Sequence, residues 1–202
     1  MTSVRLLLFV CLAGAFCFPA AIAAPRDQKE ITQLYQRGLA GDADAVEECI
    51  SKLEAVLQAE PANYLARVYL GSAYTLRSRD LGFGPRKLQA LKQGLAVMDE
   101  AVAAAPNEPK IRLARALTTS ALPGLFGRGA ESRKDFLLLA KSAEASTSRL
   151  GAGDLQMIYY QAGLAAKSQG DREQANALLQ KALQHGDDAA LMRKVRSALA
   201  TL

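Results

Sequence analysis

The chain has no tryptophan, a single histidine and only three cysteines among its 202 residues. With so few sulfur and imidazole ligands, a zinc site of the cysteine and histidine type cannot be assembled. Runs of valine, isoleucine and threonine of strand length are also missing, whereas alanine and leucine dominate the apolar residues. The composition therefore favours helices throughout, and a 50% hydrophobic content is enough for one well-packed domain.

The first residues have the pattern of a secretory signal peptide. Arg5 precedes an uncharged run from Leu6 to Phe16, and small residues follow. We assign residues 1–24 to this signal, with cleavage after Ala23 or Ala24, and expect an exported protein, either periplasmic or secreted. A retained membrane anchor is the alternative, but the run is too short to span a bilayer comfortably. No stable membrane insertion is therefore expected after cleavage.

Removal of the signal leaves residues 25–202 as a single domain with 24 basic and 20 acidic side chains, a net charge of +4. These charges are spread along the chain and form no basic stripe with interleaved aromatics, so we expect no nucleic-acid partner. Cys49 is then the lone cysteine, which excludes an intramolecular disulfide. It falls on the apolar stripe of an expected helix, which favours a buried thiol over a reactive one.

Helical periodicity recurs before two prolines, Pro61 and Pro106. Apolar residues at three- and four-residue steps predict a helix from about Arg86 to Ala105, with one face formed by Leu88, Leu91, Leu95, Met98 and Val102. The same template fits Val46, Ile50, Leu53 and Leu57 before Pro61.

The pattern of small and large residues resembles the tetratricopeptide repeat, a helix-turn-helix unit of about 34 residues that stacks into a solenoid. The last repeat matches best, through Tyr159, Ala162, Gly163 and Ala166, a turn at Gly170-Asp171, and then Ala175, Leu179 and Ala182. A second copy carries Leu70, Gly71, Tyr74, Gly94, Met98, Ala101 and Pro106. The resemblance implies an all-α solenoid of antiparallel helix pairs, about four of them, followed by a C-terminal capping helix.

Two parts of the chain depart from the repeat pattern. Gln36 and Arg37 occupy the positions of an expected Leu-Gly pair, so the first helix either caps the array or packs differently. The third copy, which begins at Ile111, is looser. At the other end, Asp187 or Asp188 is placed to cap a final helix.

Two connections are longer than the repeat requires, over residues 77–87 and 122–129. Turns that join first to second helices emerge on one edge of a solenoid, so we expect these two segments to be neighbours. They suggest a partner-binding edge of apolar and basic residues, namely Phe83, Arg86, Lys87, Phe126 and Arg128, with Arg133 and Lys134 as further candidates. The structural alternative is that both phenylalanines cover the core and the glycines merely permit tight turns.

No catalytic constellation is recognisable. His185 stands where a helix should end, beside no nucleophile or orienting carboxylate, and is interpreted as a helix-terminal residue. Tyr64, Tyr69, Tyr74, Tyr159 and Tyr160 are expected to pack between helices, with one or two lining a groove.

We therefore expect a non-enzymatic scaffold or adaptor of the periplasm or cell envelope that binds a protein or peptide and needs no cofactor. The alternative is a soluble component of a transport system that binds a small or lipid-like ligand between its helices. The sequence does not define the oligomeric state. An open groove would favour the first function, and a closed apolar cavity the second.

Overall fold

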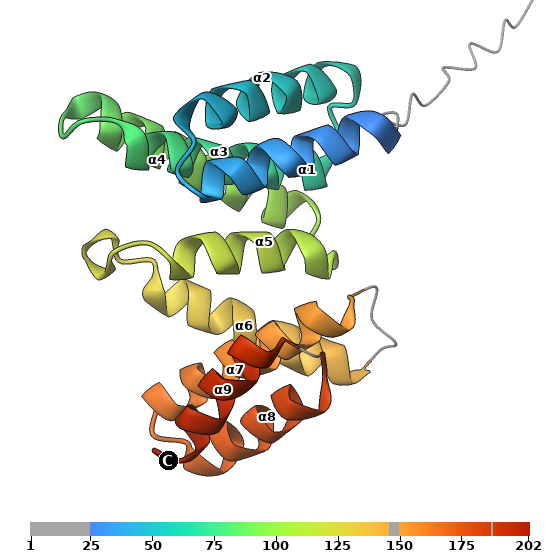
Figure 1. The fold of residues 1–202 in the computed structure, drawn as a ribbon, viewed down its shortest axis with the longest axis vertical. Coiled ribbons are helices and arrows are strands. Elements are labelled where there is room, and N and C mark those ends of the chain that lie inside the picture. The colour runs from blue at the N-terminus through green and yellow to red at the C-terminus, as the bar shows by residue number, and fades with distance from the viewer. Residues whose placement is uncertain (1–24, 146–149, 187) are drawn as a thin grey trace, which may run out of the picture.

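The computed structural model describes residues 25–145, 150–186 and 188–202, and the predicted signal peptide lies outside them. The regular structure of these residues is entirely helical (Figure 1). The elements are α1 Pro25–Leu39, α2 Ala43–Ala59, α3 Tyr64–Asp80, α4 Pro85–Ala104, α5 Pro109–Ser120, the 3₁₀ turn η1 Gly124–Phe126, α6 Gly129–Ala145, α7 Ala152–Ser168, α8 Arg172–Gln184 and α9 Ala189–Leu199.

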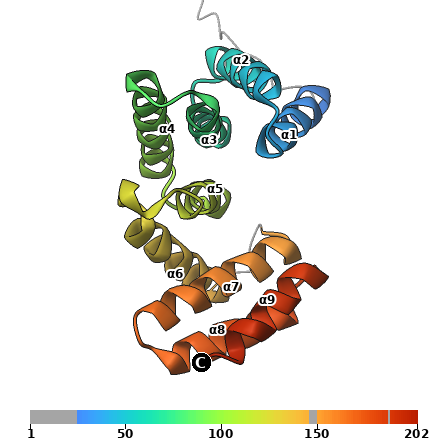
Figure 2. The ribbon, with the colours of Figure 1, turned by 60° about the vertical axis from the view of Figure 1, so that its left-hand side comes forward.

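The helices form four antiparallel pairs, α1/α2, α3/α4, α5/α6 and α7/α8, and α9 packs on the last pair. The first helices of successive pairs are also in contact, α1 with α3 and α3 with α5. In Figure 2, α4 lies on the side of α3 that faces away from α1. The expected solenoid of four helix pairs with a C-terminal capping helix is therefore confirmed.

Short polar side chains and prolines set where the helices begin. The carboxylates of Asp42 and Asp171 and the amide of Asn63 each accept a hydrogen bond from a backbone N–H of the first turn that follows. Asp188 does the same at the start of α9, which confirms the expected cap on the final helix. The helix predicted from about Arg86 to Ala105 is observed one residue earlier at each end, as α4.

The pairs are held together by close backbone approach at small residues. A Cβ atom added to Gly71 in α3 would lie 2.7 Å from the carbonyl oxygen of Gly94 in α4 and 2.9 Å from the backbone nitrogen of Met98. In the last pair, a Cβ on Gly163 would lie 2.7 Å from Cγ of Leu179. The helices therefore sit where only glycine fits, as the repeat pattern predicted.

The first pair also has a close helix contact at a glycine. This glycine comes one residue after Gln36 and Arg37, which do not match the repeat pattern. A Cβ on Gly38 would lie 2.8 Å from Cγ2 of Val46, so α1 and α2 approach closely near their turn. The first helix is therefore paired like the others, with its contact glycine shifted toward the end of the helix.

The connection over residues 77–87 is not a long turn, which corrects the expectation from the sequence. Helix α3 continues to Asp80 and α4 starts at Pro85, so only residues 81–84 are non-helical. The extra residues lengthen both helices into a projecting hairpin, which Figure 1 shows at the left. Over residues 122–129 the chain does form a long connection, which contains η1 and ends where α6 begins.

One member of the predicted stripe on α4 departs from the core. Leu91, Met98 and Val102 are buried, but Leu88 is 46% exposed. Leu88 lies in the first turn of α4, in the projecting part of the hairpin, and stays about half exposed.

Cys49 is buried in the packing of the first two pairs, with 1% of its surface exposed, and its Sγ lies 3.9 Å from the carbonyl oxygen of Ile31. Burial raises the pKa of the thiol to about 11, because the thiolate loses its hydration. The expected structural role of this cysteine is confirmed.

The Gly71 contact gives a direct test of the packing. We expect Gly71→Ala to destabilise the fold by about 2 kcal/mol, because the added methyl meets backbone atoms that cannot rotate away. Gly153→Ala is the matched control, since a Cβ there meets nothing within 4 Å. Urea unfolding should show the control within about 1 kcal/mol of the native chain. Equal effects of the two substitutions would contradict the close-approach model.

The thiol gives a second test. At pH 8 we expect a disulfide reagent to label Cys49 very slowly in folded residues 25–202, where it is the lone cysteine, because burial and the raised pKa leave little accessible thiolate. Unfolding in guanidinium should make labelling complete within the mixing time of an ordinary assay. Rapid labelling of the folded protein, measured by absorbance of the released thiol, would show that the site opens readily.

Candidate partner-binding groove

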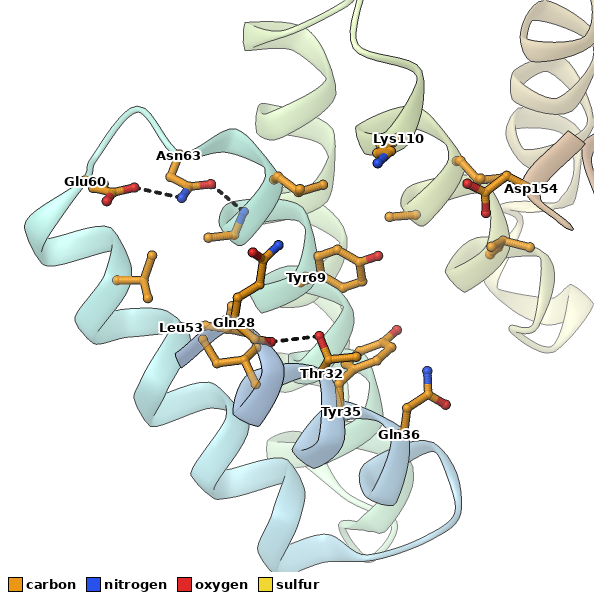
Figure 3. A pocket seen from close by; sticks show the side chains of 17 residues that line it. Gln28, Thr32, Tyr35, Gln36, Leu53, Glu60, Asn63, Tyr69, Lys110 and Asp154 are labelled. Carbon is orange, nitrogen blue, oxygen red and sulfur yellow. Dashed lines mark hydrogen bonds between the residues drawn. The ribbon is translucent and has the colours of Figure 1, made fainter. Parts of the chain in front are cut away.

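A groove of about 450 Å3 crosses the first helices of the N-terminal pairs (Figure 3). Its walls come from α1, α3 and α5, its far end from the start of α7, and one side from α2. The apolar lining consists of Ile31, Leu53, Val56, Leu65, Ala66, Leu113, Ala114 and Leu117. The groove thus follows the stacking direction of the solenoid.

Two tyrosines form the centre of this surface. The rings of Tyr35 in α1 and Tyr69 in α3 meet edge to face, with centroids 5.3 Å apart and planes at 79°. The Tyr35 hydroxyl is 2.7 Å from Oγ of Ser72, and that atom is 2.8 Å from Oγ1 of Thr118 in α5. A chain of hydrogen bonds therefore links three successive pairs beneath the groove.

The electrostatic surroundings keep both tyrosines protonated. Burial raises the pKa of Tyr35 above its ordinary value, and the hydrogen bond with Ser72 offsets part of that rise. For Tyr69, burial again raises the pKa, and the negative charge of Asp154 adds to the effect. The Tyr69 hydroxyl therefore stays a hydrogen-bond donor across the physiological pH range.

Polar side chains surround the apolar lining of the groove. Some of them are hydrogen-bonded within the protein, and others are exposed to solvent. The Asn63 amide accepts from the backbone N–H of Ala66 and donates to Glu60, so it serves the local fold. Gln28 and Gln36 in α1 are exposed, as is Lys110 in α5, which belongs to none of the ion pairs among the described residues. These side chains offer donors and acceptors to a bound molecule.

The groove has buried apolar residues at its floor, among them Leu53 and Leu113, and is open to solvent at Tyr69 and Leu117. Tyr69 and Leu117 are 36% and 37% exposed although both line it, and the polar residues of α1 on its rim are exposed. A closed cavity would have buried its lining. Apolar side chains with donors and acceptors beside them suit an extended peptide segment, whose backbone needs hydrogen bonds and whose side chains need apolar contact.

Tyr69 is the one groove residue among the five tyrosines singled out from the sequence. Tyr74 and Tyr159 are buried and Tyr64 and Tyr160 are partly buried, as expected for packing positions. Tyr35 was missed, because the repeat pattern could not be aligned over the first helix.

The five residues predicted to form the binding edge differ in their exposure and in their hydrogen-bond and ion-pair partners. Phe83 is fully exposed at the tip of the α3–α4 hairpin, and Arg86 is exposed beside it. The ammonium of Lys87 donates to the carbonyl oxygens of Arg79 and Leu81, at 3.2 and 3.0 Å, which holds the turn in place.

The other two predicted edge residues lie at the second connection. Phe126 is partly buried, and Arg128 forms ion pairs with Asp99 of α4 and Glu131 of α6, both at 2.6 Å. Asp99 lies 14 residues along α4 from Pro85, about 21 Å at 1.5 Å per residue. The structure therefore does not bring all five residues into one continuous patch, although the two turns share an edge of the molecule (Figure 1).

Arg128 belongs to an ion-pair network that joins α4, α5 and α6. Arg115, which is buried, pairs with Asp135 at 2.8 Å and also reaches Asp99 and Glu131. Arg112 adds a second contact to Asp135, at 2.8 Å. This network occupies the loosest repeat, where glycine contacts are missing from the sequence.

Other candidate sites have structural explanations. His185 is the residue at the C-terminal cap of α8, and its ring stacks on Tyr159 with centroids 5.2 Å apart, which confirms the helix-terminal interpretation. In the described part of the chain, no cluster of three or more histidine, cysteine or carboxylate residues is placed to hold a metal ion. Across these same residues, none of the helices is both long and apolar enough to cross a bilayer.

Stacked antiparallel helix pairs with an open groove across their first helices define a tetratricopeptide-like solenoid. In agreement, a search of solved structures finds a thermophilic tetratricopeptide-repeat protein from Thermus thermophilus, with a TM-score of 0.56 and 19% sequence identity. The match covers 86% of this chain and 99% of that one. No protein-family model and no curated protein gave a match. The likeness establishes the fold.

The ion-pair network leads to a testable expectation. We expect Asp135→Ala to destabilise the protein by about 3 kcal/mol, because it leaves the buried Arg115 without its main counterion. Glu47→Ala, which breaks the exposed pair with Arg77, should cost less than about 1 kcal/mol. Thermal unfolding of the two variants measures the difference. A small effect of Asp135→Ala would show that the network contributes little to joining the pairs.

Proposed function

We propose that this chain is a non-enzymatic scaffold or adaptor that holds a segment of a partner protein in the groove across α1, α3 and α5. The observation that supports this proposal is that the groove is open to solvent and lined by both apolar and polar side chains. Exposed Tyr69 and Leu117 lie beside the polar residues. A stack of rigid helix pairs presents such a surface without any reactive group. No cofactor is needed for this role.

The chemistry of the groove favours an extended peptide with apolar side chains. Leu113 and Leu117 provide apolar contact on α5, and the protonated Tyr69 hydroxyl is a donor for a peptide carbonyl. Lys110 favours an acidic side chain or a chain-terminal carboxylate at its end of the groove, because no carboxylate in the described structure pairs with it.

The cellular setting rests on the sequence. The signal-like residues 1–24 lead us to place the protein in the periplasm or cell envelope, or outside the cell. A scaffold there would act in assembly, transport or secretion of envelope components.

The second candidate function is a soluble transport component that binds a small or lipid-like ligand. The groove volume of about 450 Å3 supports it, because small-molecule sites fall in the range of about 300–1,000 Å3. Such sites bury most of their ligand, however, and the exposed lining of this groove favours a peptide.

Site-specific crosslinking in the producing cells distinguishes the two functions. With a photoreactive amino acid at Leu117, we expect covalent capture of a protein, identified by mass spectrometry of the crosslinked band. The matched control is Gln93, an exposed position on α4 outside the groove, where no such band should form.

Tyr69→Ala should reduce the Leu117 crosslink about tenfold, because aromatic residues at the centre of an interface typically contribute more than about 1 kcal/mol. Circular dichroism of the variant checks that the helices persist. Equal capture at both positions would contradict groove binding, and recovery of small molecules alone would favour the transport component.

A further inference from the structure

The two turns on the shared edge each expose one large apolar side chain. Phe83 is 100% exposed at the tip of the lengthened α3–α4 hairpin, and Leu125 is 81% exposed in η1 between α5 and α6. Single exposed apolar side chains are normal on a protein surface; what distinguishes these two is that both project from turns on the same edge of the molecule. Figure 1 shows both turns projecting toward the left of the molecule.

Neither tip is covered by the rest of the described chain. Gly82 and Gly84 flank Phe83, and Gly124 and Gly127 lie on either side of Leu125-Phe126; a Cβ added to any of these four glycines would meet no atom within 4 Å. The two tips are therefore separate projections into solvent, and no part of the described chain forms a lid or pocket for them.

Basic side chains without acidic partners lie close to both tips in the sequence. None of the ion pairs in the described structure involves Arg86, Arg133 or Lys134, whereas the Lys87 ammonium is held by the carbonyl oxygens of Arg79 and Leu81. The nearby acids are already neutralised, Asp80 by Arg79 and Glu131 by Arg115 and Arg128. Each tip therefore combines an apolar end with an excess of positive charge behind it.

We propose that this edge docks on the surface of a bilayer that contains anionic phospholipid, with Phe83 and Leu125 entering the interfacial region and the basic residues facing the lipid phosphates. A protein interface of ordinary size needs a contiguous packed patch of about 800 Å2 on each partner. Two isolated tips do not form such a patch, whereas a fluid lipid phase closes around each side chain separately. Anionic headgroups also complement the unpaired cations.

The lengthened hairpin gives this docking a geometric basis. The roughly eleven additional residues between Tyr74 and Gly94 extend α3 and α4 past the ordinary turn, by about 8 Å if shared equally between the two helices. Phe83 is thereby placed in the turn at the end of this projecting hairpin. The groove proposed for peptide binding uses other residues, so docking and partner capture are separable.

The absence of tryptophan supplies the probe. The variants Phe83→Trp and Leu125→Trp each carry a single tryptophan at one tip, and Leu138→Trp places it on α6, at a residue 42% exposed. With vesicles of mixed phosphatidylglycerol and phosphatidylcholine, we expect a blue shift of emission and quenching by brominated lipid for both tip variants. Leu138→Trp should show neither. Residues 1–24 are the same in all three proteins.

A second measurement tests whether the basic residues contribute to membrane binding. Adding Arg86→Gln to Phe83→Trp should weaken binding to the anionic vesicles about fivefold, the effect of removing one basic residue near a charged surface. Vesicles of phosphatidylcholine alone should give little or no shift. Unchanged emission of both tip variants with anionic vesicles, in proteins that circular dichroism shows to be folded, would overturn the proposal. An equal shift at position 138 would do the same.

Discussion

Close approach of paired helices is the constraint on which the rest of this structure depends. At Gly71 and Gly94 the backbones of α3 and α4 lie so near that no side chain fits between them, and at Gly163 and Gly38 a side chain of the paired helix, Leu179 or Val46, fills the space that a Cβ would need. Close contact lets the larger residues fill the space between successive pairs at native packing density. Because each pair buries its apolar face against the next, the stack leaves the first helices exposed on one side as a continuous surface.

Polar contacts then fix how the pairs sit on one another. The chain from Tyr35 through Ser72 to Thr118 connects three first helices, and the network around Arg115 and Asp135 connects α4, α5 and α6. Buried polar groups of this kind are costly unless all are paired, so they disfavour other arrangements of the same helices. The chain from Tyr35 to Thr118 joins α1, α3 and α5, the helices that form the walls of the groove.

The proposed activities use two surfaces with different chemistry. The groove combines partly exposed aromatic and aliphatic residues with donors and acceptors, which suits the backbone and side chains of a peptide. The edge with Phe83 and Leu125 offers separate apolar tips backed by cations, which suits a fluid anionic phase. The lengthened α3–α4 hairpin connects the two, since α3 contributes Tyr69 to the groove and leads directly to the projecting turn. A scaffold with both surfaces would hold a partner segment next to a membrane.

The sequence by itself determined the helices, their pairing and the contact glycines of the second and fourth pairs. These depend on local periodicity and on small residues at fixed spacing, which are readable along the chain. The sequence led us to expect a long connection over residues 77–87, most of which is helical in the structure. Added residues that continue a helix and residues that form a loop give the same spacing between Tyr74 and Gly94, so the spacing cannot distinguish them.

Only the tertiary structure decided which residues form the groove and how the edge is divided. Tyr35 and Lys110 lie 75 positions apart in the sequence, and they line one groove only because of how successive pairs stack. Arg128, expected at a binding edge, is paired with Asp99 and Glu131 instead. The partners of a charged side chain depend on which helices pack beside it. This is a long-range property that no local sequence pattern encodes.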